Sequence, residues 1–460
     1  MIASRLGRWN DAWRRIWFQE RTTLPLEVIR MGLGFMFLVT YGSLSPELFA
    51  LYGDDGWISR AAIEGTIDDP LTQSVFFYFN APWQWIAMHV VFLGACFALA
   101  VGWRTSWVKW VVLIGHLSYI SRNSAILYGI DGIASQLLIV LCVMPIGSAL
   151  SLDRVRAVRR AKRSDLAAVL EPATSAWAFA GIRLIQLQMA VLFFFAGAEK
   201  LAGPSWWRGE ALWIGLTNVE YANFWLDILA HNFWLANLLA YGTIMLELAY
   251  PFLVWQRHTR PTMLAGAVLL HIGIAVMLNL YAFSAIMILG HLAFLRPEWL
   301  ARWGNKWKAR TGAMEMIYDG MCGFCVRSMA AFLAFDGLKQ IHIRDYRTDP
   351  SPVVPSEKVD RALYVVTDDG RALPGFDAYR YIVARVPGMW WLVPLFYIPL
   401  LSRAVGRPIY NWIASHRHVI STCVVGPTVG SACALPTGAR NTRDTSDSRI
   451  NSTRDGSPGA

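Results

Sequence analysis

The sequence predicts an α-helical membrane domain with about eight transmembrane helices, followed by a small α/β domain. Three observations lead to this fold class. The 460 residues are 55% hydrophobic and only 16% charged, which is too apolar for an ordinary soluble protein. Apolar segments near the length that crosses a bilayer recur through the first two thirds of the chain. From residue 312 onward, the pattern changes to short strand-like and helix-like segments around a Cys-x-x-Cys pair.

A basic, amphipathic lead-in at residues 1–25 precedes the membrane domain, which we place at 26–305. The lead-in lacks the hydrophobic region and the cleavage site of a signal peptide. The third and last predicted spans are short, so we expect them to be tilted, broken or shielded by neighbours. The predicted spans are residues 26–44, 84–102, 107–121, 131–150, 178–199, 233–255, 261–281 and 284–296.

Basic and non-basic connections alternate along these spans, and the strongest basic cluster is residues 151–163. The positive-inside rule then predicts a multi-pass protein of the cell inner membrane with both termini in the cytoplasm. The same clustering explains the net charge of +10 without a nucleic-acid partner. Loops 45–83 and 200–232 are expected on the opposite side, where they would roof a cavity. If 261–296 crosses only once, however, the C-terminal part changes side.

The α/β domain is predicted at residues 312–420. Its strands are expected in MEMIY, IHIRDY and ALYVV, with helices at 326–335 and in FDAYRYIVARV. This order resembles a thioredoxin-like domain, although no Thr-Pro pair precedes the third strand. The apolar run 389–401 contains two prolines, so we expect a helix on the sheet or against the membrane, with a ninth span as the alternative. The tail at 436–460 has almost nothing to bury and is expected to be disordered.

Several ionisable residues lie inside the predicted spans, where such residues are costly and tend to be functional. Arg30 and Arg183 lie near cytoplasmic ends, where they either snorkel or act in a site. Glu247 needs a partner, for which Arg183 or a histidine is expected. His271 and His291 are expected to share a site, and no metal is predicted. His89 and His116 are expected to be hydrogen-bonded core residues.

The stretch VLFFFAGAEKLAGPSWWRGEAL places Lys200 at the end of an apolar helix. A lysine held partly out of water is a potential base, whereas the plainer alternative is an interfacial lysine paired with Glu199. The stretch resembles the lysine-bearing signature of the HTTM family, which is related to the vitamin K-dependent gamma-carboxylase. LYGDDGWIS, GWRTSWV and SRNSAILYGIDGIASQLLIVLCVMPIGSALSLD resemble further family segments in the same order. The resemblance covers residues 15–305.

This resemblance implies that Lys200 is a base acting on a quinone or a reduced vitamin K-like quinol. It also implies that Asn123 hydrogen-bonds the quinol or an oxyanion. The position of the carboxylase's active-site histidine falls on Ser124, and the large lumenal region is replaced by the Cys-x-x-Cys domain. Both departures argue against authentic carboxylation. The candidate substrate-binding residues are Arg122, Asn123, Trp206, Glu210, Glu247, His271 and His291.

The segment YDGMCGFCVRSM resembles the opening of the DCC family of thiol-disulfide oxidoreductases, as do GRALPGFDAYRYI and YNWIASHRH further on. The resemblance covers residues 315–420 and implies that Cys322 attacks and Cys325 resolves. A helix N-terminus stabilises a thiolate through its dipole and its N–H groups. A zinc site is disfavoured because a second Cys-x-x-Cys pair is missing. The other cysteines are expected to be core residues or bystanders; they are Cys96, Cys142, Cys423 and Cys433.

Three functions are compatible with these patterns. The first is a membrane-bound redox protein with thiol-disulfide oxidoreductase activity, coupled to a lysine-bearing pocket for a quinol-like or lipid-like substrate. The second is carboxylase-like modification of a protein or peptide. The third is a non-enzymatic transporter or immunity-type membrane protein with a regulatory Cys-x-x-Cys domain. The predicted partners are the lipid bilayer and a thiol redox partner, and a cytoplasmic pair would rest in the reduced state.

Overall fold

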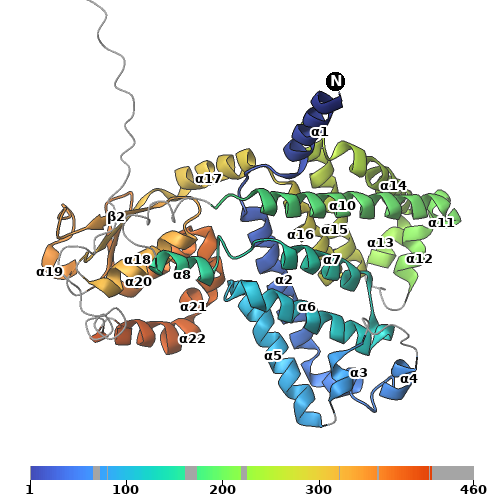
Figure 1. Ribbon diagram of the computed structural model, residues 1–460, viewed down its shortest axis with the longest axis horizontal. Coiled ribbons are helices and arrows are strands. Elements are labelled where there is room, and N and C mark those ends of the chain that lie inside the picture. The colour runs from blue at the N-terminus through green and yellow to red at the C-terminus, as the bar shows by residue number, and fades with distance from the viewer. Residues whose placement is uncertain are drawn as a thin grey trace, which may run out of the picture. The chain divides into compact units, whose positions relative to one another are not determined.

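The computed structural model describes residues 2–65, 73–79, 81–160, 173–218, 225–320, 322–359, 362–413 and 415–416. The chain forms two compact units. The first contains residues 1–312 with 330–339 and 382–394, and the second is built around a sheet from residues 313–329 and 340–381. In Figure 1 the helices of the first 312 residues run from blue to yellow and the strands are orange.

All eight predicted spans coincide with helices, and residues 2–17 of the lead-in are helical as well. The helices of the first 312 residues are α1 (Ile2–Trp17), α2 (Leu24–Ser43), α3 (Leu48–Tyr52), α4 (Arg60–Glu64), α5 (Pro82–Val101), α6 (Thr105–Arg122), α7 (Gly129–Val143), α8 (Leu152–Arg160), α10 (Ala176–Ala202), α11 (Pro204–Trp207), α12 (Ala211–Thr217), α13 (Trp225–His231), α14 (Phe233–Leu253), α15 (Arg260–Leu278), α16 (Tyr281–His291) and α17 (Pro297–Thr311).

Five of the described helices, α2, α5, α10, α14 and α15, are long and apolar enough to cross a membrane. The prediction of eight spans is therefore not confirmed. Helix α7 has 15 residues and reaches only about 22 Å, well short of the ~30 Å hydrocarbon core. Helix α16 is shorter still, and α6 is made too polar by residues such as Lys109 and Arg122. The five long helices nevertheless expose large apolar side chains outward, as expected of a lipid-facing surface.

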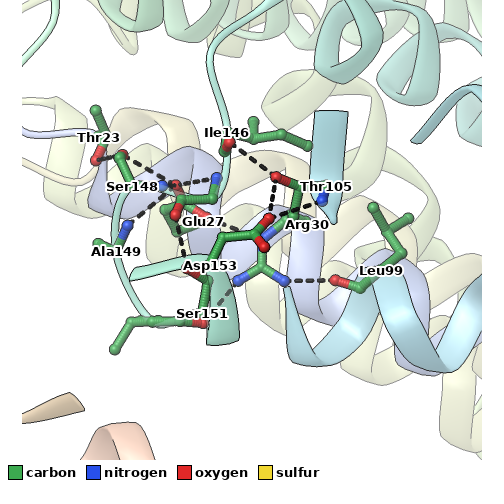
Figure 2. Close-up of polar contacts among 12 residues, drawn as sticks. Thr23, Glu27, Arg30, Leu99, Thr105, Ile146, Ser148, Ala149, Ser151 and Asp153 are labelled. Carbon is green, nitrogen blue, oxygen red and sulfur yellow. Dashed lines mark hydrogen bonds and ion pairs between the residues drawn. The ribbon is translucent and has the colours of Figure 1, made fainter. Parts of the chain in front are cut away.

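A buried ion pair joins the start of α2 to the loop between α7 and α8, as Figure 2 shows. Glu27 and Arg30 are both fully buried, and Arg30 Nε donates to Glu27 Oε2 over 2.8 Å. Glu27 Oε1 accepts the backbone N–H groups of Gly147, Ser148 and Ala149 at 2.7, 2.8 and 3.3 Å. The loop thus wraps its amides around the carboxylate, which satisfies a charge that would otherwise be costly to bury.

The guanidinium group of Arg30 caps the C-terminal end of α5. Arg30 donates to the carbonyls of Leu99, Ala100 and Leu150, so each of its three nitrogen atoms has an acceptor. Arg30 therefore does not snorkel, because its guanidinium donates to carbonyls at the C-terminal end of α5 in place of water.

Asp153 extends this cluster to α6, where its carboxylate accepts the N–H groups of Arg104 and Thr105 at 2.9 and 2.8 Å. The segments GWRTSWV and GSALSLD, far apart in sequence, thus meet through a helix cap.

His89 and His116 are core residues, as expected from the sequence. His89 is hydrogen-bonded to the Tyr119 hydroxyl at 2.6 Å and to Ser45 Oγ at 2.8 Å. His116 is hydrogen-bonded to the Tyr41 hydroxyl at 2.8 Å, and its other ring nitrogen lies 3.3 Å from a backbone carbonyl. With both nitrogens engaged, neither histidine is available as a ligand without losing a core hydrogen bond.

The second unit contains a mixed four-stranded sheet of order β2-β1-β3-β4. Strand β1 pairs in parallel with β2 and antiparallel with β3, which pairs antiparallel with β4. The three predicted strands are confirmed, whereas β4 was not predicted because it has three residues and ends in proline. The elements after residue 312 are β1 (Met314–Tyr318), α18 (Gly323–Phe335), β2 (Ile341–Asp345), α19 (Ser356–Val359), β3 (Tyr364–Val366), β4 (Ala372–Pro374), α20 (Gly375–Arg385), α21 (Val393–Tyr397) and α22 (Pro399–Leu401).

The apolar run after α20 is helical but broken. Segments Pro387–Tyr397 and Pro399–Ile413 meet at an angle of 78°, because Pro399 cannot continue the preceding helix. The predicted disordered tail at 436–460 lies outside the described residues, as do Cys423 and Cys433.

Candidate functional site

Lys200 lies in the last turn of α10, opposite Glu247 in the middle of α14. Lys200 Nζ donates to Glu247 Oε1 over 3.0 Å and lies 2.8 Å from Oε2. The side chains are 20% and 9% exposed, respectively. Lys200 therefore pairs with Glu247 rather than with its neighbour Glu199, and the expected pairing of Glu247 with Arg183 or a histidine is wrong.

Small residues allow the two helices to approach at this point. A Cβ atom at Gly197 would lie 2.9 Å from Leu248 Cδ2 and 3.2 Å from Glu247 Cβ. Gly266 on α15 has a similar role, because a Cβ there would lie 2.9 Å from Leu246 Cδ1. The Ala-Gly-Ala segment before Lys200 thus allows the lysine to reach a carboxylate on the neighbouring helix.

The ion pair lines a cavity of about 460 Å³ between α10, α14 and α15. Apart from Lys200, Glu247 and Thr243, the lining consists of Leu, Ile, Met, Ala and Gly residues with Trp206. Lys200 Nζ lies 5.1 Å from the centre of the Trp206 ring, within the range of a cation–π interaction. Trp206 and Leu212 come from loop 200–232, whereas residues of loop 45–83 line a different cavity.

The ion pair is not saturated. Lys200 has two protein acceptors, Glu247 Oε1 and the Ala196 carbonyl at 3.4 Å, although an ammonium has three donors. Glu247 Oε2 is buried and accepts no hydrogen bond from the described residues, but it lies 2.8 Å from Nζ, so Lys200 balances its charge. A proton can therefore pass within the pair, and the remaining donor of Lys200, whose side chain is 20% exposed, is the group that the pair offers to a ligand.

His271 and His291 lie together, as predicted, with ring centres 5.7 Å apart and side chains that are almost fully buried. His291 Nδ1 is hydrogen-bonded to the Tyr250 hydroxyl over 3.2 Å. The other three ring nitrogens of the pair have no hydrogen-bond partner among the described residues. Neither histidine is among the residues that line the Lys200 cavity.

Three further predicted site residues lie elsewhere. Arg122 donates to the carbonyls of Gly53 and Ile58, and Asn123 donates to the Leu51 carbonyl over 2.7 Å. Both side chains are fully buried and fix the segment after α3. Glu210 pairs with Arg208 in the exposed turn between α11 and α12. The structure brings only Lys200, Glu247 and Trp206 together at the cavity.

Cys322 and Cys325 lie at the beginning of α18, where the first cysteine acts as a helix cap. The Cys322 carbonyl accepts the Val326 N–H over 3.0 Å, and its Sγ accepts the Cys325 N–H over 3.3 Å. Sγ thus occupies the place of an N-cap oxygen, where an N–H donor and the helix dipole stabilise negative charge. Cys322 is buried and Cys325 is half-buried.

The YDG turn before the cysteines is fixed by two carboxylates. Asp319 accepts both Nε and Nη2 of Arg347, at 2.6 and 3.1 Å. Asp345 accepts the Gly320 N–H over 3.0 Å, and a Cβ at Gly320 would lie only 1.8 Å from Asp345 Oδ2. A larger residue here would therefore displace the Asp345 carboxylate from its hydrogen bonds. Sequence reasoning missed Asp345 and Arg347, because Asp345 ends β2 and Arg347 follows it, far from the motif in sequence.

No group of three or more His, Cys, Asp or Glu side chains suited to a metal occurs among the described residues. We found no match among the curated proteins or the solved structures. Comparison with protein families matches residues 18–299 to the HTTM domain and residues 316–423 to the DCC1-like thiol-disulfide oxidoreductase domain. These matches, with the apolar helices, indicate a membrane protein with a redox function. The chain belongs to the HTTM family and carries a DCC1-like thiol-disulfide oxidoreductase domain after its membrane region.

Proposed function

We propose that this protein exchanges electrons between a thiol partner and a quinol-like or lipid-like molecule that binds beside Lys200. The observation that carries the proposal is the unsaturated Lys200–Glu247 ion pair in the wall of an otherwise apolar cavity. Ionisable groups at membrane depth are retained mainly where they act on a substrate or a proton.

The cavity favours a ligand that arrives from the lipid phase. Leu238 and Leu269 belong to its lining, and both are largely exposed on the outside of the helices. An apolar molecule can therefore enter between α14 and α15 without crossing water. The volume of about 460 Å³ suits a substituted ring, and the ion pair supplies the polar groups that orient it.

Lys200 and Glu247 provide the proton chemistry that such a ligand needs. Transfer of a proton from Nζ to Glu247 leaves a neutral amine at the cavity, which can accept a proton from an acidic hydroxyl of the ligand. In the reverse direction the ammonium can donate a proton to a ligand oxygen. A quinone-type ligand would supply the two-electron chemistry, for which no side chain in the cavity is suited.

The second unit provides the thiol chemistry. Its strand order and directions are those expected of a thioredoxin-like domain, with Cys322 and Cys325 following the central strand. A thiolate of the reduced partner attacks a Cys322–Cys325 disulfide at Cys322 Sγ and forms a mixed disulfide, and Cys325 leaves as a thiolate. The second thiolate of the partner then attacks the partner's own sulfur, which releases the partner as a disulfide and leaves Cys322 and Cys325 as a dithiol. The dithiol must then be reoxidised, and a quinone that takes up two electrons and two protons can do so and leaves as the quinol.

The test uses the purified full chain in lipid nanodiscs, with the Cys322–Cys325 pair reduced. We add a short-chain ubiquinone and follow both the appearance of the quinol and the loss of two thiols. We expect both signals in the wild type and their loss in Lys200→Met and Cys322→Ser. Lys306→Met, which changes an exposed lysine on α17, is the matched control. If quinol appears and thiols are lost equally in Lys200→Met, the proposal is wrong.

A further inference from the structure

A second cavity lies at the other end of α10, about 26 Å along the helix from Lys200. It has a volume of about 320 Å³, at the lower end of the range for small-molecule sites (about 300–1,000 Å³). Its lining is mainly polar, in contrast to the apolar Lys200 cavity. The polar and charged residues that matter are Arg21, Arg183, Arg260, Arg296, Gln186 and Glu298.

The four arginines come from four separate parts of the chain and are held in place. Arg260 donates from Nε and Nη2 to the carbonyls of Val254 and Trp255, at 2.8 and 2.9 Å. Arg183 lies over the Phe179 ring at 4.9 Å, and Arg21 contacts the same ring at 5.4 Å. The guanidinium groups of Arg260, Arg183 and Arg21 are therefore ordered before any ligand arrives, and Arg296 lies 5.8 Å from the Trp299 ring.

The positive charge of this cavity is not balanced. None of the four arginines forms an ion pair within the described part of the chain, and Glu298 is the single acidic residue in the lining. By contrast, Arg30 and Arg347 each have a carboxylate partner. Four like charges around one cavity repel one another unless an anion lies between them.

Two helices begin at the same cavity. Helix α15 begins at Arg260 and α17 begins at Pro297, and neither has a side-chain cap. The helix dipole adds positive potential at these ends, and helix N-termini commonly bind phosphate. The helix dipoles and the arginines therefore both favour an anionic ligand.

We propose that this four-arginine cavity binds a phosphate group, carried either by a lipid headgroup or by a soluble phosphorylated compound. The planar guanidinium matches two phosphate oxygens at once, and several arginines can share one phosphate. Basic pockets at the ends of transmembrane helices are known to receive anionic headgroups. The site is separate from the redox chemistry proposed above, so it would anchor or regulate the protein.

The test measures binding to the purified full chain in a non-ionic detergent. One arm titrates inorganic phosphate and follows the midpoint of thermal unfolding. The other arm records native mass spectra with phosphatidylglycerol or with phosphatidylcholine. We expect phosphate to raise the midpoint, or phosphatidylglycerol to remain bound where phosphatidylcholine does not. The first result would identify a soluble ligand, the second would identify a headgroup, and both results together would also support the site.

Variants separate this site from general attraction to anionic lipid. The side chain of Arg296 makes no hydrogen bond or ion pair among the described residues, so Arg296→Gln should weaken binding about tenfold or more with little effect on folding. Arg257→Gln is the matched control, because Arg257 is exposed and does not line the cavity. If Arg296→Gln lowers the yield of folded protein, Arg21→Gln replaces it. Absence of binding in both arms, or equal weakening by the control, would overturn the proposal.

Discussion

Two ion pairs in the first unit are built in opposite ways. Glu27–Arg30 is fully buried, and backbone groups from α5 and the loop after α7 surround it on every side. Lys200–Glu247 is partly exposed, lines a cavity and leaves Glu247 Oε2 without a hydrogen bond from the described residues. The first pair connects helices, whereas the second is available to a ligand.

The comparison shows why an ionisable residue inside a membrane domain does not by itself mark a functional site. Burial raises the cost of a charge in both places, but at Glu27 the loop amides and Arg30 together offset that cost. At Glu247 the described residues offer one partner, Lys200, and the pair lines a cavity large enough for a ligand. An ion pair without backbone donors that lines a cavity is therefore the better criterion for a functional site.

The largest expected effect is on stability, at the fully buried Glu27–Arg30 pair, which we call the closed pair. Arg30→Met should lower the free energy of unfolding by about 3–5 kcal/mol, because it leaves Glu27 buried without its charge partner. Titration of the purified protein with sodium dodecyl sulfate measures this change. A loss below about 1 kcal/mol would show that the loop amides alone satisfy Glu27.

The cap formed by Asp153 should have a smaller effect. Asp153→Ala removes the acceptor for two N–H groups at the start of α6, and such caps contribute about 0.5–2 kcal/mol. The same titration applies, and Asp153→Asn, which keeps one acceptor oxygen, should recover part of the loss. Equal effects of the two substitutions would contradict the capping role.

The Lys200–Glu247 pair, which we call the open pair, should contribute little to stability. Lys200→Met should change the free energy of unfolding by no more than about 1 kcal/mol, because Glu247 can take up a proton once its partner is gone. Glu247→Gln should behave similarly. A destabilisation comparable to that of Arg30→Met would remove the distinction between the two pairs.

The smallest effect is expected at an exposed pair in the second unit. A hydrogen bond from Arg371 holds the pKa of Asp369 at about 2, with a further contribution from Thr367. Because this pKa is lowered on folding, the pair stabilises the fold above pH 3.8 and loses that effect as the pH falls toward 2. Arg371→Ala should raise the pKa of Asp369 toward 3.8, as measured by carboxyl NMR titration, with only a slight loss of stability at neutral pH because the pair is exposed. An unchanged pKa would contradict the assignment.

Much of the fold could be predicted because its signals are local. The apolar helices and the strands before and after the cysteine motif follow directly from residue patterns. The number of spans could not be predicted, because α7 and α16 end earlier than their apolar segments do. Strand β4 carries too few residues to show an alternating pattern.

The sequence identified residues of the candidate site but not how they contact one another. Lys200 and Glu247 were both identified as unusual, yet their pairing depends on the packing of α10 against α14, which sequence spacing does not show. Glu27 was missed because its partners are backbone amides, and these leave no side-chain signature. The four-arginine cavity was missed because its arginines belong to four separate segments.

The central claim is that the open pair binds a ligand and the closed pair does not. The most direct measurement is the dissociation constant of a short-chain ubiquinone for the purified full chain in nanodiscs. We compare the wild type with Lys200→Met and with Asp153→Ala, which is mildly destabilised but remote from the cavity. The account predicts at least about tenfold weaker binding for Lys200→Met, the loss of one charge-assisted hydrogen bond, and no change for Asp153→Ala. Equal affinity in all three proteins would contradict it.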